Sequence, residues 1–220
     1  MVEGGSLENC SPEESGPWVR ILLPPPVFKN RTCFQKNMHR IMNISTKFTY
    51  NDYFHMPDEK RYELIEGELF MAPSPNEAHQ RISGDLEFLL RQHVRENGLG
   101  FVYDAPFDVV LSDEDVVQPD ILFISKERSS IITVDNVRGV PDLIIEIISM
   151  STSKRDKKEK NEIYSKYGVK EYWIVDPTVE NIEVKVLEED GLETIKTYTK
   201  DEMLTSQVLP DLRIDLKVVF

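Results

Sequence analysis

The sequence predicts a mixed α/β (α+β) fold, in which helices flank a central mixed sheet. Two helical patterns, at 76–97 and 151–168, alternate with short extended segments. Two of these segments, "PDILFIS" and "PDLIIEIIS", are apolar on both faces, which is typical of strands inside a covered sheet. The order of the elements therefore favours layers of helix and sheet around one core.

The first 41 residues differ in composition from the rest. They mix Gly, Ser and Glu with a triple proline and show no helical or strand period. We expect residues 1–41 to be a poorly ordered extension or a mis-assigned start, and residues 42–220 to form a single domain; a tail that docks on a partner is the alternative. Both cysteines, Cys10 and Cys33, lie in this segment, so the core has neither a disulfide nor a thiolate zinc site.

The charge of the chain lies in the predicted domain. The net charge is −13, and residues 1–41 carry five Lys or Arg against four Asp or Glu, which leaves −14 on residues 42–220. No apolar run approaches the length that spans a bilayer, and the N-terminus has no signal-peptide pattern. We expect a cytoplasmic protein without membrane contact.

The elements follow in order along the chain. "RYELIEGELFMAPSP" predicts a β-hairpin with its turn at Glu66-Gly67. A helix follows at 76–97, with Asn76 as its N-cap and Gly98 just past its end. After it come three extended segments, "GFVYDAPFDVVL", "PDILFIS" and "PDLIIEIIS".

The second half begins with the helix at 151–168. Ser151, Thr152 or Ser153 can cap it, and Gly168 ends it. "EYWIVDP" is predicted to be a buried strand whose aromatic residues pack in the core. A strand-rich end is predicted from "NIEVKVLEE", "LETIKTYT" and "LRIDLKVVF", of which the first two form a hairpin.

Glu146 is a carboxylate in the middle of an apolar strand. Side chains alternate faces along a strand, so Glu146 points the same way as Ile144 and Ile148. Burial of an ionised carboxylate costs several kcal/mol unless a cation, a metal or a proton compensates it. A structural ion pair with a nearby Lys or Arg is one interpretation, and a metal ligand is the other.

Asp120 is the better second carboxylate for a metal. Asp142 lies on the same strand as Glu146 but about 13 Å away, at about 3.3 Å per residue, which is too far to share an ion. Asp120 follows Pro119 and opens a neighbouring strand, and adjacent strands lie only about 4.8 Å apart. We therefore expect Asp120 and Glu146 to bind one metal ion.

Lys160 completes the predicted site. The helical period places Lys160 on the same stripe as Ile163, Tyr164 and Tyr167, so Lys160 points toward the sheet and needs an anion. Glu146 is the obvious anion, either directly or through a substrate phosphate. Two carboxylates that bind Mg²⁺ and a lysine that neutralises developing charge are what phosphodiester hydrolysis requires.

Several blocks of the sequence resemble a known family. Pro119-Asp120 and "EII" at Glu146 resemble the PD-(D/E)XK nuclease signature, except that Ile148 stands where the lysine is usual. More specifically, "YELIEGELFMAPSPNEAHQ", "VVQPDILFIS", "GVPDLIIEIIS" and "GVKEYWIVDP" resemble the Uma-type family of putative restriction endonucleases. The resemblance covers residues 45–220, nearly the whole predicted domain.

The resemblance implies a restriction endonuclease-like core and a DNA endonuclease that depends on Mg²⁺, with Mn²⁺ as a substitute. It implies Asp120 and Glu146 as catalytic metal ligands and a catalytic lysine moved to the helix, at Lys160. It also points to Glu63 and His79 at the edge of the site. An exposed hairpin carboxylate is the alternative for Glu63, and a surface or packed histidine is the alternative for His79.

The acidic charge argues against a nuclease because it repels nucleic acid. Residues 153–170 soften this objection, since they hold seven Lys or Arg against three Asp or Glu. Two other functions stay open: a catalytically silent binding module with this fold, and a metal-dependent hydrolase of a small phosphoester. A homodimer is a further hypothesis, because cutting both strands of a duplex favours a two-fold pair.

Overall fold

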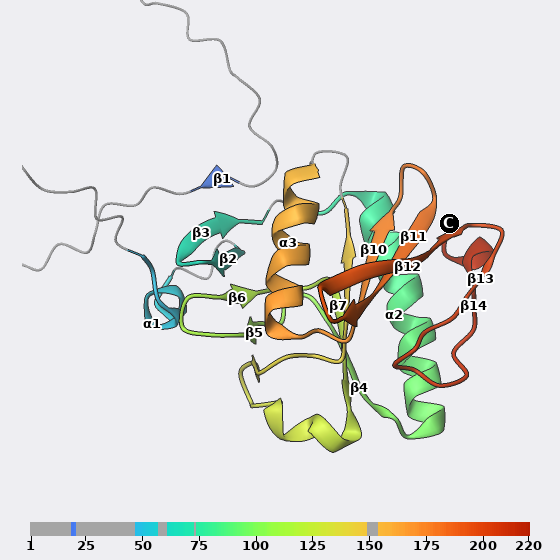
Figure 1. Ribbon diagram of the computed structural model, residues 1–220, viewed down its shortest axis with the longest axis horizontal. Helices are drawn as coiled ribbons and strands as arrows, with labels where there is room; N and C mark the ends of the chain where they lie inside the picture. The colour runs from blue at the N-terminus through green and yellow to red at the C-terminus, as the bar shows by residue number, and fades with distance from the viewer. Residues whose placement is uncertain (1–18, 21–46, 57–60, 73, 149–153) are drawn as a thin grey trace, which may run out of the picture.

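The computed structural model describes residues 19–20, 47–56, 61–72, 74–148 and 154–220 (Figure 1). It confirms the mixed α+β class, with helices on both sides of a mixed sheet. The main helices and strands of the first half are α1 (Tyr50–Phe54), β2 (Tyr62–Ile65), β3 (Glu68–Met71), α2 (Glu77–Asn97), β4 (Gly100–Asp104), β5 (Val109–Val110), β6 (Val116–Val117), β7 (Ile121–Ser125) and β8 (Val137–Arg138). Those of the second half are β9 (Leu143–Ile147), α3 (Lys154–Tyr167), β10 (Glu171–Asp176), β11 (Asn181–Glu188), β12 (Gly191–Thr199), β13 (Met203–Leu204) and β14 (Ile214–Asp215).

The central sheet has the strand order β12-β11-β10-β9-β7-β4. The pair β9 and β10 is parallel, whereas β7 pairs antiparallel with both β9 and β4. Both β7 and β9 therefore lie inside the sheet, as their apolar faces predict. The helix α3 is the connection between the two parallel strands, as such pairs require.

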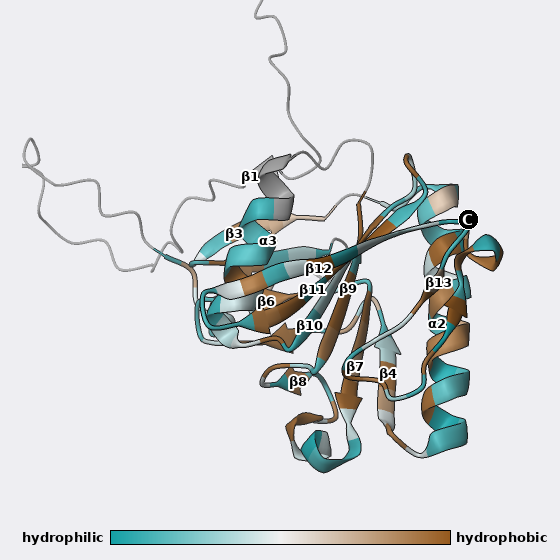
Figure 2. Cartoon of the chain, turned by 45° about the vertical axis from the view of Figure 1, so that its right-hand side comes forward, coloured by the Kyte–Doolittle hydropathy of each residue, from teal (hydrophilic) through white to brown (hydrophobic). Residues whose placement is uncertain are grey.

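The helices α2 and α3 cover opposite faces of this sheet (Figure 1). On one face, Ile82, Leu86 and Leu90 of α2 pack against Ile145 and Ile147. The other face packs against α3 and the second sheet. Figure 2 shows the same division as hydrophobic strands between helices whose outer sides are hydrophilic. Because side chains alternate between the two faces along β9, each side chain of that strand points either to the α2 face or to the α3 face of the sheet.

A second sheet, with the order β1-β3-β2-β6-β5-β8, lies beside α3. Its hairpin β2–β3 turns at Glu66 (φ 51°) and Gly67 (φ 76°), the two positive φ angles of a tight hairpin turn, so the predicted hairpin is confirmed. The strand β1 is Val19–Arg20, which pairs with β3. The predicted disorder of residues 1–41 otherwise lies outside the described residues and stays a prediction.

The predicted helix ends are confirmed where the structure describes them. Asn76 caps α2 by accepting a hydrogen bond from His79 N (2.9 Å), and Gly98 ends it in the left-handed region (φ 63°). Gly168 (φ 81°) follows α3 in the same conformation. The predicted caps at 151–153 lie outside the described residues. None of the helices described is long and apolar enough to cross a bilayer.

The chain end differs from the prediction. Within "LRIDLKVVF" the strand β14 has only two residues, Ile214–Asp215, and a 3-10 helix follows at Leu216–Val218. Its partner β13 is equally short, so the ladder has no further residues to pair. Leu212, Ile214 and Leu216 are all buried against the α2 face of the central sheet, which explains the strand-like apolar pattern.

Candidate active site

Asp120, the residue that precedes β7, lies level with Glu146 of the neighbouring strand β9. Ile121 of β7 pairs with Ile145 of β9 in the antiparallel register, which puts Asp120 and Glu146 opposite each other at the next step. Asp120 Oδ2 accepts a hydrogen bond from Ile147 N at 2.8 Å. The predicted meeting of these two carboxylates is therefore present in the fold.

Glu146 faces α3, and Lys160 of that helix reaches it. Lys160 Nζ donates to Glu146 Oε1 at 3.0 Å and to Glu63 Oε1 at 2.5 Å. The lysine side chain is only 7% exposed, so the predicted inward direction of Lys160 is confirmed. This ammonium links the strand carboxylate to the hairpin carboxylate inside the protein.

Glu63 is buried rather than exposed. Its side chain is 1% exposed, which excludes the alternative of a surface carboxylate on the hairpin. Its Oε1 accepts from Gln118 N at 2.7 Å in addition to Lys160, while its Oε2 is buried without a hydrogen-bond partner among the residues that the structure describes. Glu63 thus belongs to the interior of the site and not to its edge.

Tyr164 is a site residue that the sequence analysis did not single out. Its hydroxyl donates to Glu146 Oε1 at 2.5 Å, and the residue is fully buried. The signal was available, because Tyr164 follows Lys160 by one helical turn on the same face of α3. Lys160 and Tyr164 together hold one oxygen of Glu146, and the other oxygen accepts no hydrogen bond among the described residues.

His79 in the first turn of α2 contacts the second carboxylate. Its Nε2 lies 3.1 Å from Asp120 Oδ2, and its side chain is 13% exposed. The ring is therefore neither a surface group nor one packed only against apolar neighbours. Asp120 Oδ2 is fixed from two sides, by this ring and by Ile147 N.

The environment shifts the pKa values of Glu146, Lys160 and His79. Burial raises the pKa of Glu146 to about 7, and the charges of Asp120 and Glu63 act in the same direction, against Lys160 and Tyr164. Burial lowers the pKa of Lys160, but Glu146 and Glu63 outweigh it, so the pKa is raised and the lysine stays protonated. Burial also lowers the pKa of His79, but Asp120 and Glu146 raise it above its ordinary value.

The two facing carboxylates fit a hard divalent cation. Within the described residues, no hydrogen bond reaches Asp120 Oδ1 or Glu146 Oε2. Mg²⁺ prefers oxygen ligands and is usually bound by one or two carboxylates, with water and substrate in its other positions. The described residues contain no cluster of three or more ligating side chains, so a metal here would depend on water and substrate for the rest of its shell.

Asp142 lies apart from the site, as the strand spacing predicts. It is buried and accepts from Ser125 N at 2.8 Å and from Arg128 at 2.9 Å, and Lys170 lies 2.6 Å from it. These contacts tie the start of β9 to the neighbouring segments. Asp142 is therefore a structural carboxylate.

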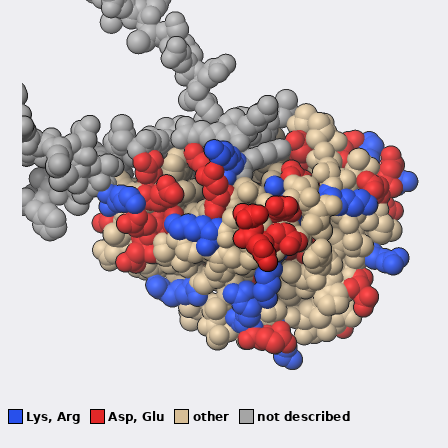
Figure 3. All heavy atoms as spheres, in the orientation of Figure 1, with Lys and Arg blue, Asp and Glu red and all other residues tan. Residues whose placement is uncertain are grey.

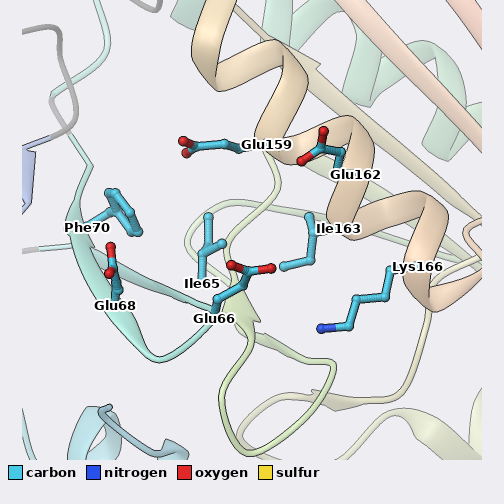
Figure 4. A pocket seen from close by; sticks show the side chains of 8 residues that line it. All are labelled: Ile65, Glu66, Glu68, Phe70, Glu159, Glu162, Ile163 and Lys166. Carbon is cyan, nitrogen blue, oxygen red and sulfur yellow. The ribbon is translucent and has the colours of Figure 1, made fainter. Parts of the chain in front are cut away.

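A pocket of about 340 Å³ lies between the hairpin and α3 (Figure 4). It is lined by Ile65, Glu66, Glu68, Phe70, Glu159, Glu162, Ile163 and Lys166. Its four glutamates repel phosphate, and it contains none of the predicted site residues. Figure 3 shows acidic and basic side chains interspersed on one face of the molecule, with acidic ones gathered near the middle.

The fold is nuclease-like, and the sequence matches a family of the restriction endonuclease-like class. Residues 50–217 match the model of the Uma2 family, described as "Putative restriction endonuclease", and the chain belongs to that family. The crystal structure of a protein from Anabaena variabilis, described as a putative nuclease belonging to DUF820, has the same fold. It superposes with a TM-score of 0.67 at 19% identity, over 79% of this chain and 97% of that one. No curated protein matches the chain.

Proposed function

We propose that the protein is an endonuclease that hydrolyses DNA phosphodiester bonds with Mg²⁺, or Mn²⁺ in its place. The observation that carries the proposal is that Asp120, Glu146 and Lys160 converge from two strands and a helix on one largely buried point. Each carboxylate keeps an oxygen without a hydrogen bond among the described residues. This is the set of groups that metal-assisted phosphodiester hydrolysis needs.

Each residue has a defined task in this proposal. Asp120 and Glu146 hold the metal, which when bound polarises the phosphate and lowers the pKa of water. Lys160 supplies a fixed positive charge beside the phosphate as negative charge develops on it. Tyr164 and Glu63 position Glu146 and Lys160, while His79 positions Asp120.

The test is nicking of a supercoiled plasmid during titration of Mg²⁺, with metal binding followed by calorimetry. We expect wild-type protein to nick and to bind metal, Glu146→Gln to do neither, and Lys160→Met to bind metal without nicking. Glu162→Gln is the matched control, because it makes the same chemical change on the exposed side of α3. Metal binding that survives in Glu146→Gln would contradict the assignment of the ligand.

One observation favours a second substrate. The net charge of −13 weakens binding to long DNA, and a small phosphoester would not meet this repulsion. The same variants are therefore assayed on a small chromogenic phosphodiester. Turnover of that compound with no plasmid nicking would identify a small-molecule hydrolase, and a lack of both activities and of metal binding would identify a silent module.

A further inference from the structure

Arg61 lies at the entrance to β2, next to the candidate site. Its Nε donates to Gln118 Oε1 at 3.2 Å. Gln118 precedes Asp120 by two residues, and its backbone N–H binds Glu63. The guanidinium is thus hydrogen-bonded to the segment that carries Asp120, a proposed metal ligand. The same segment binds Glu63, the counter-ion of Lys160.

Arg61 is a half-buried cation that forms no ion pair with any residue that the structure describes. Among the Lys and Arg side chains that the structure describes, five form no ion pair, namely Arg61, Arg95, Lys126, Arg138 and Arg213. Four of these five are exposed, and Arg61 alone is half-buried. Partial removal of a charge from water costs free energy, which a bound anion would recover.

Arg61 keeps donors for an anion, because Gln118 Oε1 takes only its Nε. The bond from Nε to Gln118 leaves the two Nη groups without a hydrogen bond among the described residues.

We infer that Arg61 binds a backbone phosphate of the nucleic acid, next to the phosphate held at Asp120 and Glu146. This inference rests on the proposed function. A guanidinium binds phosphate oxygens through paired N–H donors, and the bond to Gln118 fixes its plane in advance. A flanking phosphate exists only in a polynucleotide, so Arg61 would also make the site prefer DNA over a small phosphodiester.

The test is binding of a fluorescein-labelled DNA duplex by anisotropy, in EDTA and at several NaCl concentrations. Arg61→Gln and Arg61→Met remove the charge, and Arg61→Lys keeps it. Arg95→Gln is the matched control, since Arg95 is exposed, forms no ion pair among the described residues and lies near the other end of α2 from His79. Melting temperatures establish that each variant is folded, and plasmid nicking and turnover of the small phosphodiester are measured in parallel.

We expect both neutral variants to bind the duplex more weakly. The slope of log K against log [NaCl] should fall by about 0.9, the value for one phosphate contact. They should raise KM for plasmid nicking and leave turnover of the small phosphodiester unchanged. Arg61→Lys and Arg95→Gln should keep the wild-type slope.

Three results would overturn the inference, and they differ from one another. A wild-type slope in Arg61→Gln and Arg61→Met, with nicking intact in the wild type, would reject Arg61 alone. A salt slope in Arg61→Lys as low as in the neutral variants would show that a positive charge at this position does not contact a phosphate. Wild-type protein that neither binds nor nicks DNA would reject the proposed function, and Arg61 with it.

Discussion

Lys160 Nζ lies 2.5 Å from Glu63 Oε1 and 3.0 Å from Glu146 Oε1, so the lysine is nearer to the hairpin carboxylate than to the strand carboxylate. Glu63 therefore neutralises much of the charge of this buried ammonium. Glu146 shares only one of its oxygens with Lys160 and Tyr164. The ion pair of Lys160 with Glu63 of the hairpin thus leaves the second oxygen of Glu146 available for a ligand.

Glu63→Gln should weaken both the fold and the site. It removes a charged partner of Lys160, and a hydrogen bond to a charged group contributes about 1.5–3 kcal/mol. It also removes a negative charge that raises the pKa of Glu146, so that pKa should fall below its wild-type value. Urea unfolding and a carboxyl NMR titration measure the two effects. An unchanged pKa of Glu146 would contradict this account of the site.

The rate of nicking should rise with pH and level off near pH 7. Metal binding needs ionised Glu146, whose pKa is raised to about 7 by burial, so the rate should increase about tenfold per pH unit below that value. The raised pKa of Glu146 has the opposite effect on stability, which falls as the pH rises. The folded state binds more protons than the unfolded state between pH 4.5 and 7, so the contribution of Glu146 is full below pH 4.5 and is lost as the pH rises through 7. A rate that is flat from pH 6 to 8 would argue against Glu146 as ligand.

Tyr164→Phe should move the pH profile to higher pH. The hydroxyl of Tyr164 lowers the pKa of Glu146, so its removal raises that pKa, while the ring stays in place. Tyr198→Phe is the control, since it also deletes a hydroxyl from a buried ring, with Thr205 as partner on the other face of the sheet. We expect the two variants to lose similar stability in thermal melts. Only Tyr164→Phe should shift the midpoint of the pH–rate profile of nicking. Equal midpoints of the two pH–rate profiles would mean that Tyr164 only packs in the core.

His79→Ala should lower metal affinity without abolishing it. Among the described residues, Asp120 Oδ2 would keep only the hydrogen bond from Ile147 N, and loss of a group that orients a ligand typically costs about 10–100-fold in affinity. Calorimetry with Mg²⁺ or Mn²⁺ measures the change. His93→Ala on the same helix, where Nε2 lies 2.9 Å from Pro210 O, should leave the affinity unchanged. If both variants bind metal as the wild type does, His79 does not position Asp120.

Asp142→Asn should separate stability from activity on the same strand. Burial raises the pKa of Asp142, but Lys170, Ser125 N and Arg128 outweigh it, so the pKa is lowered. Its stabilisation is present above about pH 4 and is lost as the pH falls further. We expect a loss of about 3–5 kcal/mol at neutral pH that shrinks at pH 3, with the nicking rate of the folded protein unchanged. Folded but inactive protein would place Asp142 in the site after all.

Local patterns predict the parts of the site that lie on regular elements. The alternation along β9 and the period of α3 were enough to direct Glu146 and Lys160 toward each other, and the apolar faces of β7 and β9 were enough to make them neighbours. Tyr164 follows from the same helical period. These residues were predictable because one period fixes the direction of each side chain.

The remaining contacts depend on tertiary structure. Glu63 meets Lys160 across 97 positions of sequence, and Arg61 meets Gln118 across 57, so no local pattern contains either pair. The two-residue strands β5, β6 and β8 exist only because neighbouring segments supply partners. The predicted closing strand was wrong outside Ile214–Asp215 for the converse reason. Its apolar residues had a core to pack against but, within the described part of the chain, no strand other than β13 to pair with.

The parallel pair β9 and β10 has a consequence for the order in which the protein is made. Every residue of the candidate site precedes Lys166, yet β9 becomes an interior strand only when β10 has been added from Glu171 onward. A ribosome therefore finishes all the reactive side chains before the chain can close the sheet that aligns them. We expect the emerging polypeptide to lack the aligned site until β10 has been translated, so the proposed nuclease activity would begin only late in biosynthesis.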